Sequence, residues 1–190
     1  MTAAALTPLS APTTAPTLGV AAGRNLIAAG AIFGAANLFQ WSVLSGALHI
    51  HPAMLSLSWP VAVGVFIVLV RRLRGIGGVA AVRAATWSRW AIFAQIAAAL
   101  TLAAASAVFG DWELMRWTSP VGLAFYAIAY SIAVVRGGSK WLAGVALGAL
   151  VAAGGVATLV GSPAQYLAYA CGLMVFALIP GAVLAFGRTR

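Results

Sequence analysis

The sequence predicts an all-α integral membrane protein with six transmembrane helices, arranged as three antiparallel hairpins with the N and C termini in the cytoplasm. The first observation is composition: the 190-residue chain is 63% hydrophobic and 7% charged, whereas soluble domains carry roughly a quarter charged residues. The second is that the apolar residues gather in six long runs. The third is that ten of the eleven Lys and Arg residues fall in gaps on one side of these runs.

Each apolar run is long enough, or nearly long enough, to cross a bilayer. About 20 residues at 1.5 Å rise per residue span a hydrocarbon core of roughly 30 Å. Pro52 and Pro163 stand where a helix would begin, a position at which the missing N–H costs nothing, and Pro120 does so if the fourth helix begins later. The expected spans are residues 26–46, 52–70, 90–109, 117–135, 141–160 and 163–186.

The basic residues orient these spans. Cytoplasmic loops are enriched in Lys and Arg, so the rich side is expected to be cytoplasmic, and only Arg116 falls on the other side. Tryptophans flank both sides, as in an interfacial belt. We therefore expect a multi-pass protein of a bacterial-type cytoplasmic membrane. The residues on the rich side are Arg24, Arg71, Arg72, Arg74, Arg83, Arg89, Arg136, Lys140, Arg188 and Arg190.

The segments between the spans are mostly short, which favours antiparallel packing of neighbours. Residues 1–23 carry no charge and repeat Ala, Thr and Pro, so we expect a flexible cytoplasmic tail ahead of a single domain over residues 24–190. These first residues lack the basic region of a secretory signal. The one long gap, residues 71–89, is expected to be a solvated basic linker or a short amphipathic segment on the membrane surface.

Small residues spaced about one turn apart predict where helices pack, because they let backbones approach closely in lipid. The alternative is that these residues line a conduit. Pro60 and Pro180 are expected to kink their helices, a feature that transporters use at binding sites. The small-residue sets are Gly30 and Gly34; Gly144, Gly148 and Ala152; and Ala94, Ala98 and Ser106.

No ionisable side chain is expected inside the hydrocarbon, and this argues against several classes of function. Proton-coupled carriers and light-driven pumps usually hold buried ionisable groups, and membrane hydrolases need paired carboxylates or a set of metal ligands. We therefore expect no enzyme. The basic residues are expected to contact anionic lipid headgroups and not nucleic acid, since no binding module is present. The single Cys171 allows no disulfide within the chain.

The uncharged polar residues form the candidate ligand-binding set. Asn37, Gln40 and Trp41 share one face of the first helix because of their i, i+3, i+4 spacing. With aromatic residues from other spans they would line a cavity in the outer half, suited to a small amphipathic ligand. Alternatively, the two amides hydrogen-bond across helices and hold them together. The aromatic candidates are Trp59, Tyr126, Tyr130 and Tyr169.

His49 and His51 suggest a metal or haem site. Residues two apart on an extended segment point the same way, so both imidazoles could bind one ion, completed by Asp111 or Glu113 from the next outer loop. The alternative is that both histidines are ordinary polar loop residues. No other cofactor is predicted.

These observations predict a scaffold or accessory subunit of a membrane assembly, which would contact other membrane proteins or further copies of itself. One alternative is a small carrier or channel for a neutral or amphipathic solute, using the outer-half cavity and the kinks. The other is a haem- or metal-binding membrane protein centred on His49 and His51.

Overall fold

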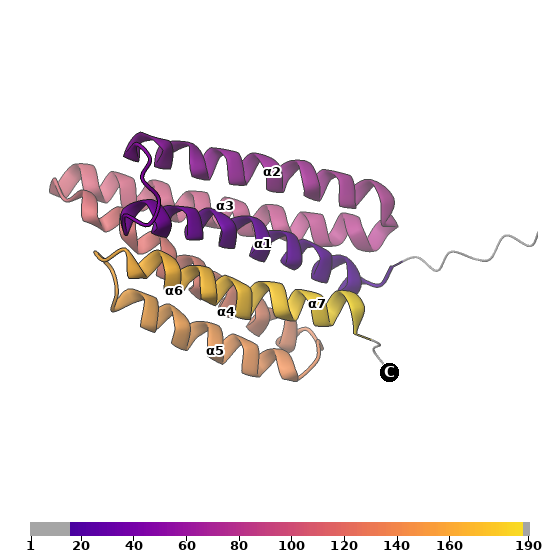
Figure 1. Cartoon of the computed structure of the whole chain (residues 1–190). Helices are drawn as coiled ribbons and strands as arrows, with labels where there is room; N and C mark the ends of the chain where they lie inside the picture. The colour runs from indigo at the N-terminus through magenta and orange to yellow at the C-terminus, as the bar shows by residue number, and fades with distance from the viewer. Residues whose placement is uncertain (1–15, 188–190) are drawn as a thin grey trace, which may run out of the picture.

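The structure is a computed structural model that describes residues 16–187, and every regular element within them is a helix (Figure 1). The all-α prediction is confirmed. The α-helices are α1 (Leu18–Leu44), α2 (Leu55–Ile76), α3 (Gly78–Phe109), α4 (Thr118–Val135), α5 (Trp141–Ala157), α6 (Ala164–Leu173) and α7 (Ile179–Phe186). The other helical segments are the 3-10 turns η1 (Pro52–Met54) and η2 (Trp112–Trp117) and the π-helical turn η3 (Met174–Leu178).

Within the described residues, five helical units are long and apolar enough to cross a membrane. They are α1, α2, α3, the unit formed by η2 and α4, and the continuous unit α6–η3–α7. Helix α5 is shorter, with 17 residues. Large apolar side chains lie exposed along several of these helices, for example Val61 and Leu147. A surface of this kind is compatible with a multi-pass helical bundle in a bilayer.

Helix α1 begins earlier than the predicted first span. The Thr17 side chain accepts a hydrogen bond from the Val20 backbone N–H (3.3 Å) and so caps the helix at this end. Residues 18–23, which were expected to belong to the tail, are therefore helical. Residues 1–15 of the predicted tail lie outside the described residues.

The segment 71–89 is not a linker, so this prediction was wrong. Helix α2 continues to Ile76 and α3 begins at Gly78. Residues 71–89 are rich in Arg and Ala, which favour helix even outside hydrocarbon. The chain reverses at Gly77 and Gly78, and the positive φ of Gly78 (63°) is a conformation that glycine adopts without strain.

Helix α1 is the centre of the bundle, packed against α6, η3 and α7 on one side and against α2 and α3 on the other. A Cβ atom added at Gly30 would lie 2.7 Å from the backbone nitrogen of Leu178, and one added at Gly181 would lie 2.8 Å from that of Ile27. The backbones touch here because both positions are glycine. The packing role predicted for Gly30 is confirmed.

The small residues predicted to pack on α5 do so only in part. The Phe176 ring packs against Gly148, and its Cε1 would lie 2.6 Å from a Cβ atom added at this glycine. Gly144 and Gly155 have no neighbour within 4 Å of such an atom. On α3, Ser106 is buried but Ala94 is exposed. Both helices therefore present small residues outward.

The two ends of the bundle differ in charge. We call the end with the α2–α3 corner, on the right in Figure 1, the basic end, and the end with η2 the acidic end. At the basic end the Arg136 Cζ lies 4.7 Å from the centre of the Trp87 ring, which joins α4 to α3. Of the described charged residues, only Asp111, Glu113 and Arg116 lie at the acidic end. The described cations of the basic end are Arg24, Arg71, Arg72, Arg74, Arg83, Arg89, Arg136 and Lys140.

Candidate functional site

The chain has five Asn and Gln side chains, and all of them lie in helices. Four of the five donate a hydrogen bond to a different helical element. In an apolar interior such a bond satisfies two groups that would otherwise be costly to bury. The four bonds run from Asn25 Nδ2 to Ser88 Oγ (3.0 Å), Gln40 Nε2 to Ser58 Oγ (2.8 Å), Gln95 Nε2 to the Thr118 carbonyl (3.2 Å) and Gln165 Nε2 to the Arg116 carbonyl.

Gln40 therefore joins α1 to α2, as the interhelical alternative expected. Ser58 in turn donates to the Leu55 carbonyl (2.8 Å), so the three groups form a satisfied chain. The sequence reasoning missed Asn25, Gln95 and Gln165. The same signal, an amide within an apolar run, was present at Gln95 and Gln165, whereas Asn25 precedes the first predicted span.

Asn37 is the exception among the amides. Its Nδ2 donates to the Phe33 carbonyl of its own helix (2.8 Å), and its Oδ1 is wholly buried without a donor among the described residues. Asn37 lies on the same face of α1 as Gly30 and Gly34, the face that packs against α6 and η3. A buried acceptor without a donor is a place where a water molecule or a ligand can bind.

Two further buried atoms lack a partner in the described part of the chain, Ser106 Oγ in α3 and Gln165 Oε1 in α6. Gln165 stands where α6 meets η2, and the Arg116 side chain crosses the same junction to reach the Gly161 carbonyl (3.2 Å). The acidic end is thus tied together by polar contacts, and Arg116, the one basic residue on this side, takes part in them.

The structure divides the predicted aromatic lining into two groups. Trp59 packs against Phe33 of α1, with ring centroids 5.7 Å apart, and Trp41 is half-buried. The tyrosines lie in the other half of the bundle, where the rings of Tyr126 and Tyr130 are 6.5 Å apart. Tyr169 is buried in a core cluster to which Tyr126 also packs. The predicted residues thus do not line one common cavity.

Tyr130 instead has a definable structural role. Its hydroxyl donates to the carbonyl of Phe176 (2.6 Å) in the π-helical turn. In a regular α-helix that carbonyl would accept from residue 180, which is proline and has no N–H. Tyr130 thus satisfies a backbone group left free by Pro180. The irregularity predicted near Pro180 is present as a π-turn.

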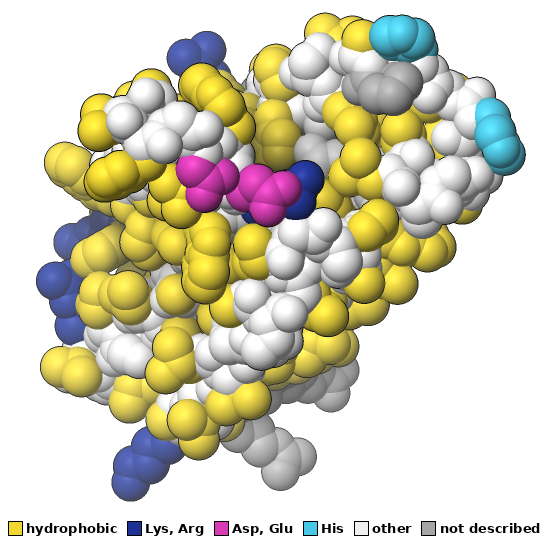
Figure 2. All heavy atoms as spheres, turned by 90° about the vertical axis from the view of Figure 1, so that its left-hand side faces the viewer, with side chains coloured by type: hydrophobic (Ala, Val, Ile, Leu, Met, Phe, Trp, Pro, Cys, Tyr) yellow, Lys and Arg dark blue, Asp and Glu magenta, His cyan; other side chains and the backbone are white. Residues whose placement is uncertain are grey.

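The histidines do not form the predicted metal site. Both are exposed, and the His51 Nδ1 accepts a hydrogen bond from the Ala53 backbone N–H (3.2 Å). Figure 2 shows the acidic end, with the two acids side by side near its middle and the histidines at its edge, separate from each other. Among residues 16–187, no three His, Cys, Asp or Glu side chains are grouped to hold a metal ion.

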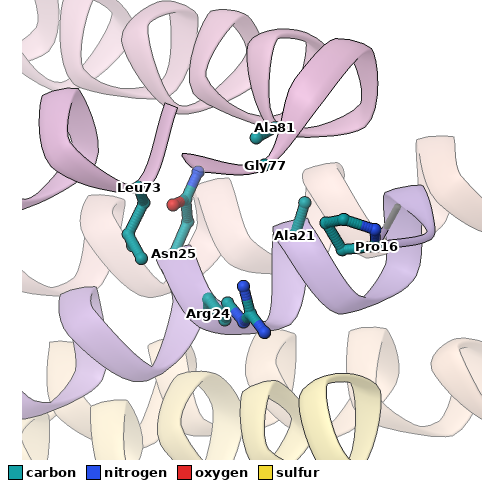
Figure 3. Close-up of a pocket in the computed structure, with 7 residues that line it drawn as sticks. All are labelled: Pro16, Ala21, Arg24, Asn25, Leu73, Gly77 and Ala81. Atoms are coloured by element: carbon teal, nitrogen blue, oxygen red, sulfur yellow. The ribbon is translucent and has the colours of Figure 1, made fainter. Parts of the chain in front are cut away.

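A small cavity lies at the basic end, between the start of α1 and the α2–α3 corner (Figure 3). Its volume is about 10 Å³, near the lower limit for one water molecule. The cavity is lined by Pro16, Ala21, Arg24, Asn25, Leu73, Gly77 and Ala81.

A larger groove, of about 530 Å³, runs between α5 and α6 and is open along its length. None of the predicted ligand-binding residues lines it, and its walls are apolar apart from the thiol of Cys171. The groove is lined by Ala152, Gly155, Val156, Leu159, Ala168, Cys171, Gly172, Val175 and Phe176.

The chain matches no protein family, no curated protein and no solved structure with which it was compared.

Proposed function

We propose that the protein is a non-enzymatic scaffold or accessory subunit in a bacterial-type cytoplasmic membrane, with six spans and both termini in the cytoplasm. Support for this orientation comes from the gathering of the described cations at one end. Within the described residues the one ion pair joins Arg116 to Glu113 at the other end (2.9 Å). Cations without acidic partners suit anionic lipid headgroups, which are the proposed contact of the basic end.

The observation that carries the scaffold role is the exposure of α3. This helix has 32 residues, of which only four are buried. Its exposed side chains include Leu100 and a face of small residues spaced three or four apart, which would let a second helix approach closely. At the same time four of the five amides make hydrogen bonds between helical elements of the bundle. The small residues of this face are Ala94, Ala97, Thr101 and Ala104.

Purification from native membranes in mild detergent tests this role. We expect the unaltered protein to elute in a complex larger than one chain. Ala97→Phe places a ring on the small-residue face of α3 and should release the monomer. Gly64→Phe is the matched control, because Gly64 on α2 is also exposed, with nothing within 4 Å of an added Cβ. An unaltered chain that elutes alone as a monomer contradicts the proposal.

Asn37 favours a second candidate function, a small carrier or channel for a neutral or amphipathic solute. Its free Oδ1 is the one amide oxygen in α1 that is fully buried and without a donor among the described residues. Proteoliposome swelling in glycerol tests it. Asn37→Leu should abolish glycerol flux without loss of folding, whereas no flux with the unaltered protein, or equal flux with the variant, excludes this function for glycerol-sized solutes.

A further inference from the structure

Specific residues of α5, α6 and the turn between them define the groove. The two helices are joined by a tight turn at Gly161, whose φ is 98°. Small residues thin the walls of the groove at Ala152, Gly155 and Ala168. Val156, which is 2% exposed, forms part of the floor.

Phe176 lines the groove at the end away from the α5–α6 turn. Its ring lies against Gly148, and its carbonyl is held by the Tyr130 hydroxyl at 2.6 Å. Both the side chain and the backbone of Phe176 are thus fixed by other helices. The groove thus extends from Phe176 toward the α5–α6 turn.

A cation, Arg116, stands at the α5–α6 turn. The Arg116 Nη1 donates to the Gly161 carbonyl (3.2 Å) and lies 2.9 Å from Glu113 Oε1, so one nitrogen makes both contacts. The other guanidinium nitrogens make no hydrogen bond within the described residues. The side chain is 39% exposed. Leu159, two residues before Gly161, belongs to the groove lining, so the contact of Arg116 with Gly161 places the charge near this part of the groove.

We infer that the groove binds one acyl chain of an anionic phospholipid and that Arg116 binds the phosphate of its headgroup. The inference rests on the proposed membrane embedding and not on the scaffold role. An acyl methylene is close in size to a water molecule, which occupies about 30 Å³ of liquid. A groove of about 530 Å³ therefore has room for one acyl chain.

Native mass spectrometry of the detergent-purified protein, titrated with phosphatidylglycerol or phosphatidylcholine, tests this inference. We expect each chain of the unaltered protein to retain one phosphatidylglycerol and to prefer it to phosphatidylcholine. Gly155→Phe fills the groove and should weaken retention by about tenfold or more. Gly64→Phe, which adds the same ring to an open face of α2, should leave it unchanged.

The headgroup contact has its own variants. Arg116→Gln should remove the part of the phosphatidylglycerol preference that Gly155→Phe also removes, and leave the contribution of the basic end. Glu113→Gln keeps the arginine but removes its acidic partner, so it should raise phosphatidylglycerol affinity. Phosphatidylglycerol should also slow maleimide labelling of Cys171, the only cysteine of the chain, which is exposed in the groove.

Equal retention by Gly155→Phe and the unaltered protein, or equal binding of the two lipids, would overturn the inference. So would a disulfide between the Cys171 residues of two chains on mild oxidation, because it would show that a second copy covers the groove. Lipid retention is counted per chain, so a protein that purifies alone contradicts the scaffold role without affecting this test.

Discussion

Asn37 and Gln40 show how differently two amides on one helix can be used. Both are buried in α1 and lie one turn apart. Gln40 reaches a hydroxyl on α2, whereas Asn37 bonds to its own helix and leaves its Oδ1 without a donor among the described residues. Burial of a paired amide is roughly neutral or favourable, and burial of an unpaired one is costly. The first amide is therefore expected to stabilise the bundle, and the second is not.

Substitution of each residue checks this difference. A double-mutant cycle of Gln40→Leu with Ser58→Ala should give a coupling of about 0.6 to 1.7 kcal/mol, as measured for interhelical bonds in membranes. Asn37→Leu should be neutral or stabilising, since leucine has a similar size and removes an unsatisfied oxygen. Reversible unfolding in mixed micelles measures both. A loss of more than about 2 kcal/mol in Asn37→Leu would show that Asn37 has a structural partner in the folded protein.

Tyr130 and Tyr126 make a second pair of matched residues. Tyr130→Phe removes the donor of the Phe176 carbonyl, which Pro180 leaves without a helical N–H, so we expect a loss of about 1 kcal/mol of unfolding free energy. Tyr126→Phe is the control, because the Tyr126 hydroxyl makes no hydrogen bond within residues 16–187. The same unfolding assay applies, and equal effects of the two changes would argue against the role assigned to Tyr130.

The sequence identified Asn37 and Gln40 as interior residues but could not supply their partners. Ser58 is 18 residues from Gln40, and Ser88 is 63 residues from Asn25. Such pairs depend on the rotation of each helix about its axis, which is set by packing and not by local pattern. The tyrosines show the same limit. The sequence could predict that they point inward, but it could not predict that they lie apart from Trp59.

At the scale of helices, the apolar runs located the elements but not all of their ends. The fourth and fifth runs begin close to the observed helices, whereas α1, α2 and α3 extend beyond the apolar segments. Hydropathy shows where hydrocarbon ends, but a helix ends where its hydrogen bonds end. Arginine and alanine favour helix in either environment, and only the glycine pair at residues 77–78 interrupts it.

Gly30 and Gly64 test the packing of helices. Gly30→Ala forces a methyl group against the Leu178 backbone, which cannot rotate away, so we expect a loss of about 1–3 kcal/mol. Gly64→Ala meets open space and replaces a poor helix former, so we expect a gain of up to about 1 kcal/mol. Unfolding of both variants in the same micelles provides the measurement, and a destabilisation common to both would contradict the assigned contact.

Over the whole molecule, the charges and the packing divide the bundle in different ways. The charges divide the bundle along the helix axes, because the described cations gather at one end. The packing divides it across the axes, because α1 has α2 and α3 on one side and α6 and α7 on the other. Helix α5 is fixed mainly by α4. Its contacts therefore leave open whether it crosses the bilayer, and the number of spans depends on this helix.

The length of α5 favours a crossing. Its 17 residues cover about 25 Å, and turn-type hydrogen bonds continue the rod to Val160, where the N–H donates to the Ala157 carbonyl (3.3 Å). Residues 141–160 then reach roughly the 30 Å that a hydrocarbon core requires. We expect Ser139 and Ser162, before and after this rod, to lie on opposite sides of the membrane.

Single cysteines placed in a Cys171→Ser background decide the point. A membrane-impermeant maleimide should label Ser162→Cys in intact cells and Ser139→Cys only after lysis, and Ser45→Cys at the acidic end should behave like Ser162→Cys. Labelling of the cysteines at 139 and 162 from the same side would reduce the spans to five. The C terminus would then lie opposite the basic end of α2 and α3, and the clustering of cations on one side would no longer hold for the whole chain.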